Sequence, residues 1–491
     1  MQPAHAHYNF GSVVPKVEEA KTRLDRIMLA QVALCVVPAM GIVMLGSPSA
    51  GAKWFYTVTV LLLAWFLLRR DRLRFVGLVL SLVPALMMLR AFFFYNSMSM
   101  MMGVGIILWA FTSPKEVSQA WNDYRWRSLL ILGGLYWLLS YLWTGNYAAN
   151  LRVLELIFSA AAVYLLAKHR EYLATALIGL CISVFSIGIA FMPRSGGDRW
   201  GHEAIDGFIL GNPITFGIPL ALIFLLSIAD NGKWLLLENR RSWRLALCLI
   251  SGAFLVLSTS RGSWAIVIVN VVVLLLIGKR QRGMLLASIA FLAVVTLALL
   301  ATQRGEFLAD FYDKTFSPDR NMAQRSSGRS DQWQIFPQVF ADSPIWGFGP
   351  GSGKSVYGQY SILEENDVAL RGDVAWHSLY LQVGVETGMI GLIGLTFLLA
   401  SLLFRGFTHW RSHDSSAPLI GIIGFMVIGL SVSALDGVSG IFLGVSFLSA
   451  KSVVAHRFKW ELGREHRDLH LLLRKRASTT NPAMRRRSLE L

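Results

Sequence analysis

The feature that most constrains this chain is a series of continuous apolar runs, many of them 17–23 residues long, separated by clusters of Arg and Lys. A helix needs about 20 apolar residues to cross the hydrocarbon core of a bilayer. Runs without alternating polarity also exclude a transmembrane β-barrel. Only 15% of the 491 residues are charged, whereas soluble domains carry about 25%. The sequence therefore predicts an all-α fold, a polytopic transmembrane bundle of 12–14 spans.

Fourteen spans can be placed on the apolar runs, and the count falls to 12 if two short segments are re-entrant or lie in the membrane interface. The expected spans are 28–46, 54–68, 75–94, 98–112, 128–144, 153–167, 171–192, 207–229, 244–258, 263–277, 284–302, 379–404, 417–433 and 438–454. The corresponding organisation is a cytoplasmic segment 1–27, transmembrane helices over 28–302, a periplasmic loop 303–376 with short helices, C-terminal transmembrane helices over 377–454, and a basic cytoplasmic tail 455–491.

The basic residues determine the expected orientation. The formal net charge is +16, and the Arg and Lys clusters fall in every second connection, for example RRDRLR (69–74), KHR (168–170) and GKRQR (278–282). Cytoplasmic loops carry such an excess, so both termini are expected in the cytoplasm. Little polar surface remains for nucleic acid, and the expected partner of the basic residues is the lipid bilayer.

One connection is far longer than the loops that join bundled helices. Residues 303–376, about 74 in number, are polar and face the periplasm by parity. Within them QWQIFPQVFADSPIWGF (332–348) predicts an amphipathic helix stopped at Asp-Ser-Pro and followed by a Gly-rich turn. GPGSGKS (349–355) resembles a phosphate-binding loop but has Phe348 where that motif requires Gly, so we interpret it as a flexible turn.

Several polar residues lie at or near the bilayer, where an unpaired polar or charged side chain is energetically unfavourable. Arg261 lies at the extracytoplasmic junction of two apolar spans, and His377 is the last polar side chain before another. Such a residue usually has a partner or a ligand. The alternative for Arg261 is that its side chain snorkels to the membrane interface, and the alternative for His377 is that it is an interface residue whose hydrogen bonds are already satisfied. Arg329 in the long loop and Arg199, between the seventh and eighth spans, are expected on the same side.

These residue types suit one kind of chemistry. An imidazole accepts a proton near neutral pH, and guanidinium groups bind phosphate in a bidentate manner. A base beside a phosphate clamp could transfer a group from a lipid phosphate to a hydroxyl. The sequence has no Asp-x-Asp pair and no His/Cys cluster, so neither a metal nor a cofactor is expected. The three cysteines, Cys35, Cys181 and Cys248, all fall in spans and are interpreted as small buried hydrophobic residues.

Three motifs resemble the O-antigen ligase and polymerase superfamily of bacterial inner-membrane glycosyltransferases, and the O-antigen ligases most closely. The first is His377-Ser378 followed by nine residues and Gly388-Met-Ile-Gly391. SSGRSDQWQIFPQVFADSPIWGFGPG (326–351) is similar to the family's Ser-Gly-Arg…Trp…Pro-x-x-Gly-x-Gly-x-Gly stretch, and STSRGSW (258–264) to its Ser-Arg-Gly motif.

The resemblance implies a multi-pass enzyme of the bacterial cell inner membrane, with its active site at the periplasmic face. It implies transfer of a glycan from undecaprenyl diphosphate to a sugar hydroxyl of the lipid A–core oligosaccharide during lipopolysaccharide assembly, with inversion and without metal or ATP. The matching positions are His377 as catalytic base and Arg261 and Arg329 as diphosphate ligands; Arg199 is a further expected phosphate contact with less support. Glu386 is expected to be structural.

Three other functions remain open at this point. A polymerase of the same superfamily would use a second lipid-linked repeat as acceptor, and a protein O-oligosaccharyltransferase would use Ser or Thr. A transporter for an anionic lipid-linked substrate would need internal repeats and charges near the membrane midplane. We found no repeat, and the notable charges gather at one face, so the transporter is the least favoured of the three.

Overall fold

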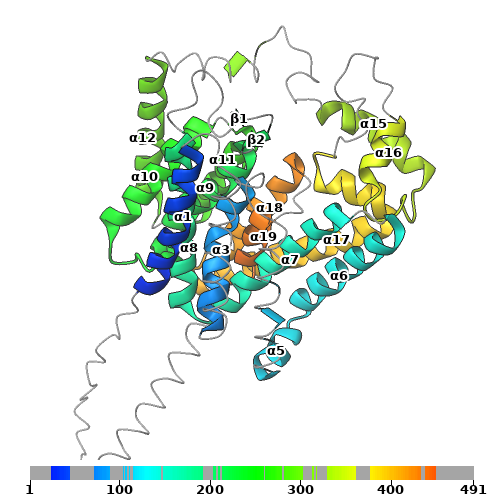
Figure 1. Cartoon of the computed structure of the whole chain (residues 1–491), viewed down its shortest axis with the longest axis horizontal. Coiled ribbons are helices and arrows are strands. Elements are labelled where there is room, and N and C mark those ends of the chain that lie inside the picture. Colours follow the sequence, from blue (N-terminus) through cyan, green and yellow to red (C-terminus); the bar gives the residue numbers. More distant parts are fainter. Residues whose placement is uncertain are drawn as a thin grey trace, which may run out of the picture.

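The structure is a computed structural model, and Figure 1 shows the whole chain. It describes residues 24–44, 71–88, 114–144, 147–191, 203–205, 208–210, 213–258, 260–278, 281–301, 329–360, 376–432 and 437–448, together with positions 103, 106, 107, 110, 312, 313 and 317. The expected spans 54–68 and 98–112 lie wholly or largely outside these residues, as does about half of the long loop.

Helices dominate the described residues, and this confirms the predicted all-α class apart from one small hairpin. The first half contains α1 (Arg26–Met44), α3 (Arg72–Met88), α5 (Pro114–Trp121), α6 (Tyr124–Thr144), α7 (Tyr147–Leu166) and α8 (Arg170–Phe191). The second half contains α9 (Pro213–Ile228), the 3₁₀ helix η1 (Ala229–Leu235), α10 (Arg241–Ser258), α11 (Arg261–Ile277), α12 (Arg282–Leu300), α15 (Arg329–Asp342), α16 (Gly353–Tyr360), α17 (Leu379–His413), α18 (Ala417–Ser431) and α19 (Gly437–Val445).

The hairpin corrects the expected start of one span. Strands β1 (Glu203–Ile205) and β2 (Phe208–Leu210) pair in antiparallel register, with Glu203 opposite Leu210. Residues 208–210 of the expected span therefore form a strand, and α9 begins at Pro213. Proline favours the first helical position because its φ is already helical and its missing N–H is not needed there.

Length and composition allow three described helical segments to cross a membrane: Phe216–Leu235, Arg241–Ser258 and Leu379–His413. Five further apolar helices among the described residues are shorter, at 10–17 residues. Large apolar side chains are exposed on the outer faces of several helices, including Leu142 on α6, Leu297 on α12 and Phe404 on α17. An apolar exterior over helices of this kind is typical of an integral membrane protein.

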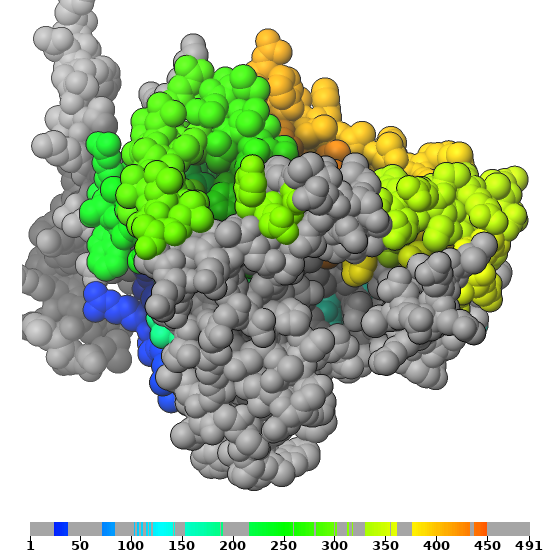
Figure 2. Space-filling view, turned by 90° about the horizontal axis from the view of Figure 1, so that it is seen from above, coloured from blue at the N-terminus to red at the C-terminus, as the bar shows by residue number. Residues whose placement is uncertain are grey.

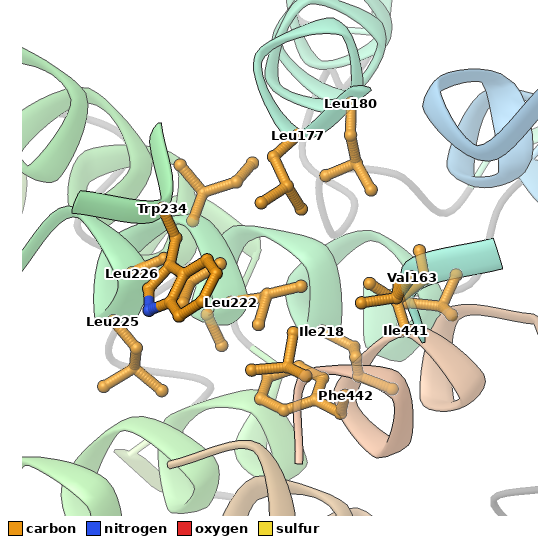
Figure 3. Close-up of a cluster of buried hydrophobic side chains, with 14 of the residues drawn as sticks. Val163, Leu177, Leu180, Ile218, Leu222, Leu225, Leu226, Trp234, Ile441 and Phe442 are labelled. Atoms are coloured by element: carbon orange, nitrogen blue, oxygen red, sulfur yellow. The ribbon is translucent and has the colours of Figure 1, made fainter. Parts of the chain in front are cut away.

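The core lies around α9, which is surrounded by α8, α10, α11 and α19 (Figure 1). In Figure 3 its side chains Ile218, Leu222 and Leu226 face Leu177 of α8 and Phe442 of α19. All are almost completely buried. The three cysteines are also buried and free, as the sequence indicated.

Helices α15 and α16 stand apart from this core and pack against the first part of α17. In Figure 2 their residues, in yellow-green, form one edge of the molecule. Helix α15 ends at Asp342, directly before Ser343-Pro344, which confirms the helix predicted there from the sequence. A second, small core forms beneath them around Val339, Tyr357 and Trp376.

Candidate active site

His377 lies immediately before the N-cap of α17, and its main chain is fixed from three sides. Ser378 caps α17 through its hydroxyl, which accepts from the backbone N–H of Leu381 at 3.5 Å. The N–H of Leu379 donates to the carbonyl of Val432, just past the end of α18, at 3.1 Å. The N–H of His377 itself donates to Gln332 Oε1 of α15 at 2.7 Å. The loop before α17 is therefore held at the junction of α15, α17 and α18.

The neighbouring Trp376 also anchors the main chain just before α17. Its side chain is only 1% exposed and packs edge-on against Phe336 and Tyr357. The indole Nε1–H donates to the carbonyl of Gly353, the first residue of α16, at 2.8 Å. With Trp376 buried beneath it, the adjacent His377 side chain is left at the surface.

Arg329 is brought to His377 by the geometry of α15. It is the first residue of that helix and precedes the buried Gln332 by three positions. Residues at i and i+3 lie on one helix face, so the helix that bonds the His377 backbone also directs Arg329 toward that site. The Nε of Arg329 is buried and has no hydrogen-bond partner among the described residues. A guanidinium with an unpaired Nε–H can still donate a hydrogen bond to an anion.

Arg261 reaches the same region from the other side of α18. It begins α11, whose N-cap Ser260 accepts from the N–H of Ser263 at 3.4 Å. Helix α11 packs closely on α18: a Cβ placed on Gly262 would lie 2.9 Å from the hydroxyl of Ser431. Ser431 directly precedes the residue that accepts from Leu379. The starts of α11 and α17 thus meet at the end of α18.

Electrostatic effects show that the three side chains influence one another. Burial and then the charge of Arg261 lower the pKa of Arg329. The pKa of His377 is lowered as well, first because protein atoms displace water around the ring and second because Arg329 is positively charged. His377 as a whole remains an exposed residue. Two guanidinium groups beside a neutral imidazole form a site that attracts anions and contains a potential base.

The fourth residue expected at the site, Arg199, lies outside the described residues. No group of three or more His, Cys, Asp or Glu side chains within the described ranges is arranged to hold a metal ion.

The Gly-rich stretch is hydrogen-bonded to α17, and the expected turn covers only residues 349–352, because α16 begins at Gly353. Helix α17 is broken at Gly388, whose φ of 62° and ψ of −154° are not helical. The carbonyls of Val385 and Glu386, freed by the break, accept from the N–H groups of Phe348 at 2.8 Å and Gly349 at 2.9 Å. Beyond the break, the N–H of Met389 donates to Pro344 at 2.8 Å. The loop thus completes the hydrogen bonding of the broken helix.

Glycine is required in this loop because the backbone enters the left-handed region three times, at Gly347, Gly349 and Gly351 with φ of 68°, 98° and 84°. Its N–H groups bind a carboxylate of the protein itself: those of Gly351 and Gly353 donate to Glu386. The sequence analysis missed Gln332 and Trp376 as supporting residues, whereas Glu386, which was expected to be structural, does bind this loop. The alternating glycines were the only sequence signal, and they did not reveal which segment the loop contacts.

Residues 246–396 fit a family model described as O-Antigen ligase. This segment begins in α10, contains Arg261, Arg329 and His377, and ends in α17 after the break. A search of curated proteins found no match.

Proposed function

We propose that the protein is a membrane glycosyltransferase that moves a glycan from undecaprenyl diphosphate to a sugar hydroxyl of lipid A–core, because residues 246–396 fit a family model described as O-Antigen ligase. The family supports a function of the O-antigen ligase or polymerase type, acting on lipid-linked glycan in a membrane. In the proposal the membrane is the bacterial inner membrane and the reaction takes place at its periplasmic face. The observation that carries it is the convergence of three segments: Gln332 of α15 bonds the His377 main chain, and the starts of α11 and α17 both meet the end of α18.

The proposed reaction is a single displacement at the anomeric carbon. The acceptor hydroxyl oxygen forms a bond to that carbon while the bond from the carbon to the diphosphate oxygen breaks. The electron pair of the broken bond leaves with undecaprenyl diphosphate, and the hydroxyl proton passes to His377. Attack opposite the leaving group inverts the anomeric centre. His377 is an exposed residue and is therefore accessible to an incoming hydroxyl.

The two arginines would stabilise the leaving group. Negative charge grows on the diphosphate as the glycosidic bond breaks, so cations already in place lower the barrier without reorganising. The buried Nε of Arg329 offers a donor to such an anion. Burial and, after it, repulsion by Arg261 lower the pKa of Arg329, and a bound diphosphate would relieve that repulsion. A bound anion would therefore stabilise the site relative to its state without a ligand.

The test is product analysis with the purified full chain in lipid nanodiscs, supplied with undecaprenyl-diphosphate-linked glycan and lipid A–core. The proposal expects glycan attached to lipid A–core. A longer lipid-linked glycan would indicate a polymerase, glycan on a Ser/Thr peptide would indicate a protein oligosaccharyltransferase, and no product with any acceptor would refute the proposal.

Variants then test the residue roles. His377→Ala should reduce transfer by roughly 10²–10⁴-fold, and Arg329→Ala and Arg261→Ala should also be severely impaired. Lysine at either arginine position should restore only part of the rate because it lacks the bidentate fork. His413→Ala and Arg411→Ala, at the opposite end of α17, are matched controls expected to behave as wild type. Wild-type rates in the site variants would exclude the assigned roles.

A further inference from the structure

Glu386 is a buried carboxyl group within α17 that the proposed reaction does not use. Its side chain is 1% exposed. Four groups donate to its two oxygens: the hydroxyl of Tyr136 on α6, the amide of Gln382 at 3.2 Å, and the backbone N–H groups of Gly351 at 2.9 Å and Gly353 at 3.1 Å. Since each partner is a donor, the carboxyl group acts here purely as an acceptor.

The two glycine amides belong to the segment that resembles a phosphate-binding loop. Gly351 precedes α16, and Gly353 is its first residue, so both N–H groups point out of a helix start, where no intrahelical acceptor exists. An apolar side chain in place of Glu386 would leave two buried donors without partners, at a cost of about 1–3 kcal/mol each. The carboxyl group of Glu386 therefore supplies the acceptors that these two N–H groups need.

Hydrogen bonds connect the same loop to His377, the candidate base. Gly353 is held by Glu386 through its N–H and holds Trp376 through its carbonyl. Trp376 is followed by His377, whose N–H is bonded to α15. The carboxyl group is thus connected to the His377 backbone through one glycine and one tryptophan. Because the loop also follows α15, which carries Arg329, it links both the base and the phosphate ligand to α17.

We propose that Glu386 is a positioning residue, whose bonds to Gly351 and Gly353 hold Trp376, and thereby His377, in register with Arg329. The kinetic part of this proposal rests on the proposed function, whereas the structural part does not. Loss of the carboxylate should loosen the loop and the start of α17 together while leaving distant helices intact.

Hydrogen exchange in nanodiscs tests the structural part without any assay of activity. Glu386→Gln keeps the size of the side chain but presents an NH₂ group to donors, so faster exchange is expected in peptides covering 347–355 and 376–382. Peptides from α10 and α11 should exchange at wild-type rates. Trp376→Phe, which removes the indole donor together with part of the buried ring, should speed exchange at 376–382 with less effect at Gly351.

Two control variants separate positioning from a general loss of charge or stability. Glu238→Gln removes a carboxylate paired with Arg170, away from this loop, and should leave both peptides unchanged. Tyr136→Phe removes a donor to Glu386 but retains both glycine bonds, so it should affect exchange less than Glu386→Gln. Wild-type exchange in Glu386→Gln, or acceleration throughout the protein, would overturn the proposal.

The kinetic readout is the division between kcat and KM. A displaced base should lower kcat of Glu386→Gln by about 10–100-fold, with KM for the lipid-linked donor within about twofold, because the arginines still bind diphosphate. An unchanged kcat would refute the positioning role. If wild-type protein transferred no glycan at all, the proposed function would fail while the exchange measurement still decided the structural part.

Discussion

At the scale of single residues, the most informative feature is the state of His377. A histidine free in water titrates near pH 6.5, and here desolvation and the charge of Arg329 lower its pKa. The neutral imidazole is the form that can accept a proton from a hydroxyl. The lowered pKa therefore keeps the candidate base in its active form around neutral pH.

This leads to a prediction on the pH dependence of glycan transfer. Below the pKa of His377 the imidazole is protonated and inactive, so kcat/KM should fall on the acidic side with a midpoint below pH 6.5, the ordinary histidine value. In Arg329→Gln the repulsive charge is absent, so the midpoint of the residual activity should move to higher pH. Initial rates of donor consumption between pH 4.5 and 8.5 give the acidic midpoint for the wild type and for the variant. A midpoint that moves to lower pH in Arg329→Gln would contradict the electrostatic argument.

Residues at the site differ in how far the sequence revealed them. Arg261 and His377 stood out because charged or titratable groups beside apolar spans are costly. Gln332 and Trp376 did not, since an amide and an indole within a polar loop have many ordinary explanations. Their importance arises from contacts with residues 45 and 23 positions away, which no local pattern encodes.

At the scale of elements, the break in α17 is the central feature. The sequence predicted a continuous span over 379–404, whereas the helix runs from Leu379 to His413 with a non-helical residue at Gly388. An isolated helix has no reason to break there, because its carbonyls and N–H groups would lose their partners. The loop from Pro344 to Gly349 supplies replacements, and this makes the break stable.

Substitution of Gly388 should therefore be much more harmful than substitution of a nearby glycine. Gly388 has a positive φ, and a Cβ there would lie 2.4 Å from the carbonyl oxygen of Ile345. Gly388→Ala should displace the loop and lower the apparent Tm and the transfer rate together. Gly394→Ala, six residues along the same helix, meets only Leu132 at 3.5 Å and should be close to wild type. Thermal unfolding of both variants in detergent, followed by transfer assays, checks the contrast; equal Tm values would argue against the docked loop.

At the scale of the whole molecule, helices approach most closely where small residues face one another. On α19, Gly437, Gly440 and Gly444 line the contact with α7. Close approach of this kind increases van der Waals contact between helices, the main attraction available where water does not drive association. The buried centre thus depends on small side chains, while large apolar side chains also cover the outside.

The α7–α19 contact gives a stability prediction with an internal control. A Cβ at Gly440 would lie 2.4 Å from the backbone oxygen of Leu156, whereas one at Gly134 of α6 would meet nothing within 4 Å. Gly440→Ala should destabilise the fold by about 1–3 kcal/mol through overpacking. Gly134→Ala should be neutral or slightly stabilising because alanine favours helix. Denaturant titration in mixed micelles compares the two, and a stable Gly440→Ala variant would contradict the tight contact.

The sequence by itself determined the helical class, most helix positions outside the undescribed ranges, and the side chains at which to look for chemistry. Apolar length and the cost of charge in a membrane are local properties, so they can be recognised along the chain. Only the tertiary structure decided where α17 breaks, what the Gly-rich loop binds, and that α11, α15 and α17 bring Arg261, Arg329 and His377 together. Those features depend on hydrogen bonds and charges between segments tens of residues apart, and a linear pattern does not specify such pairings.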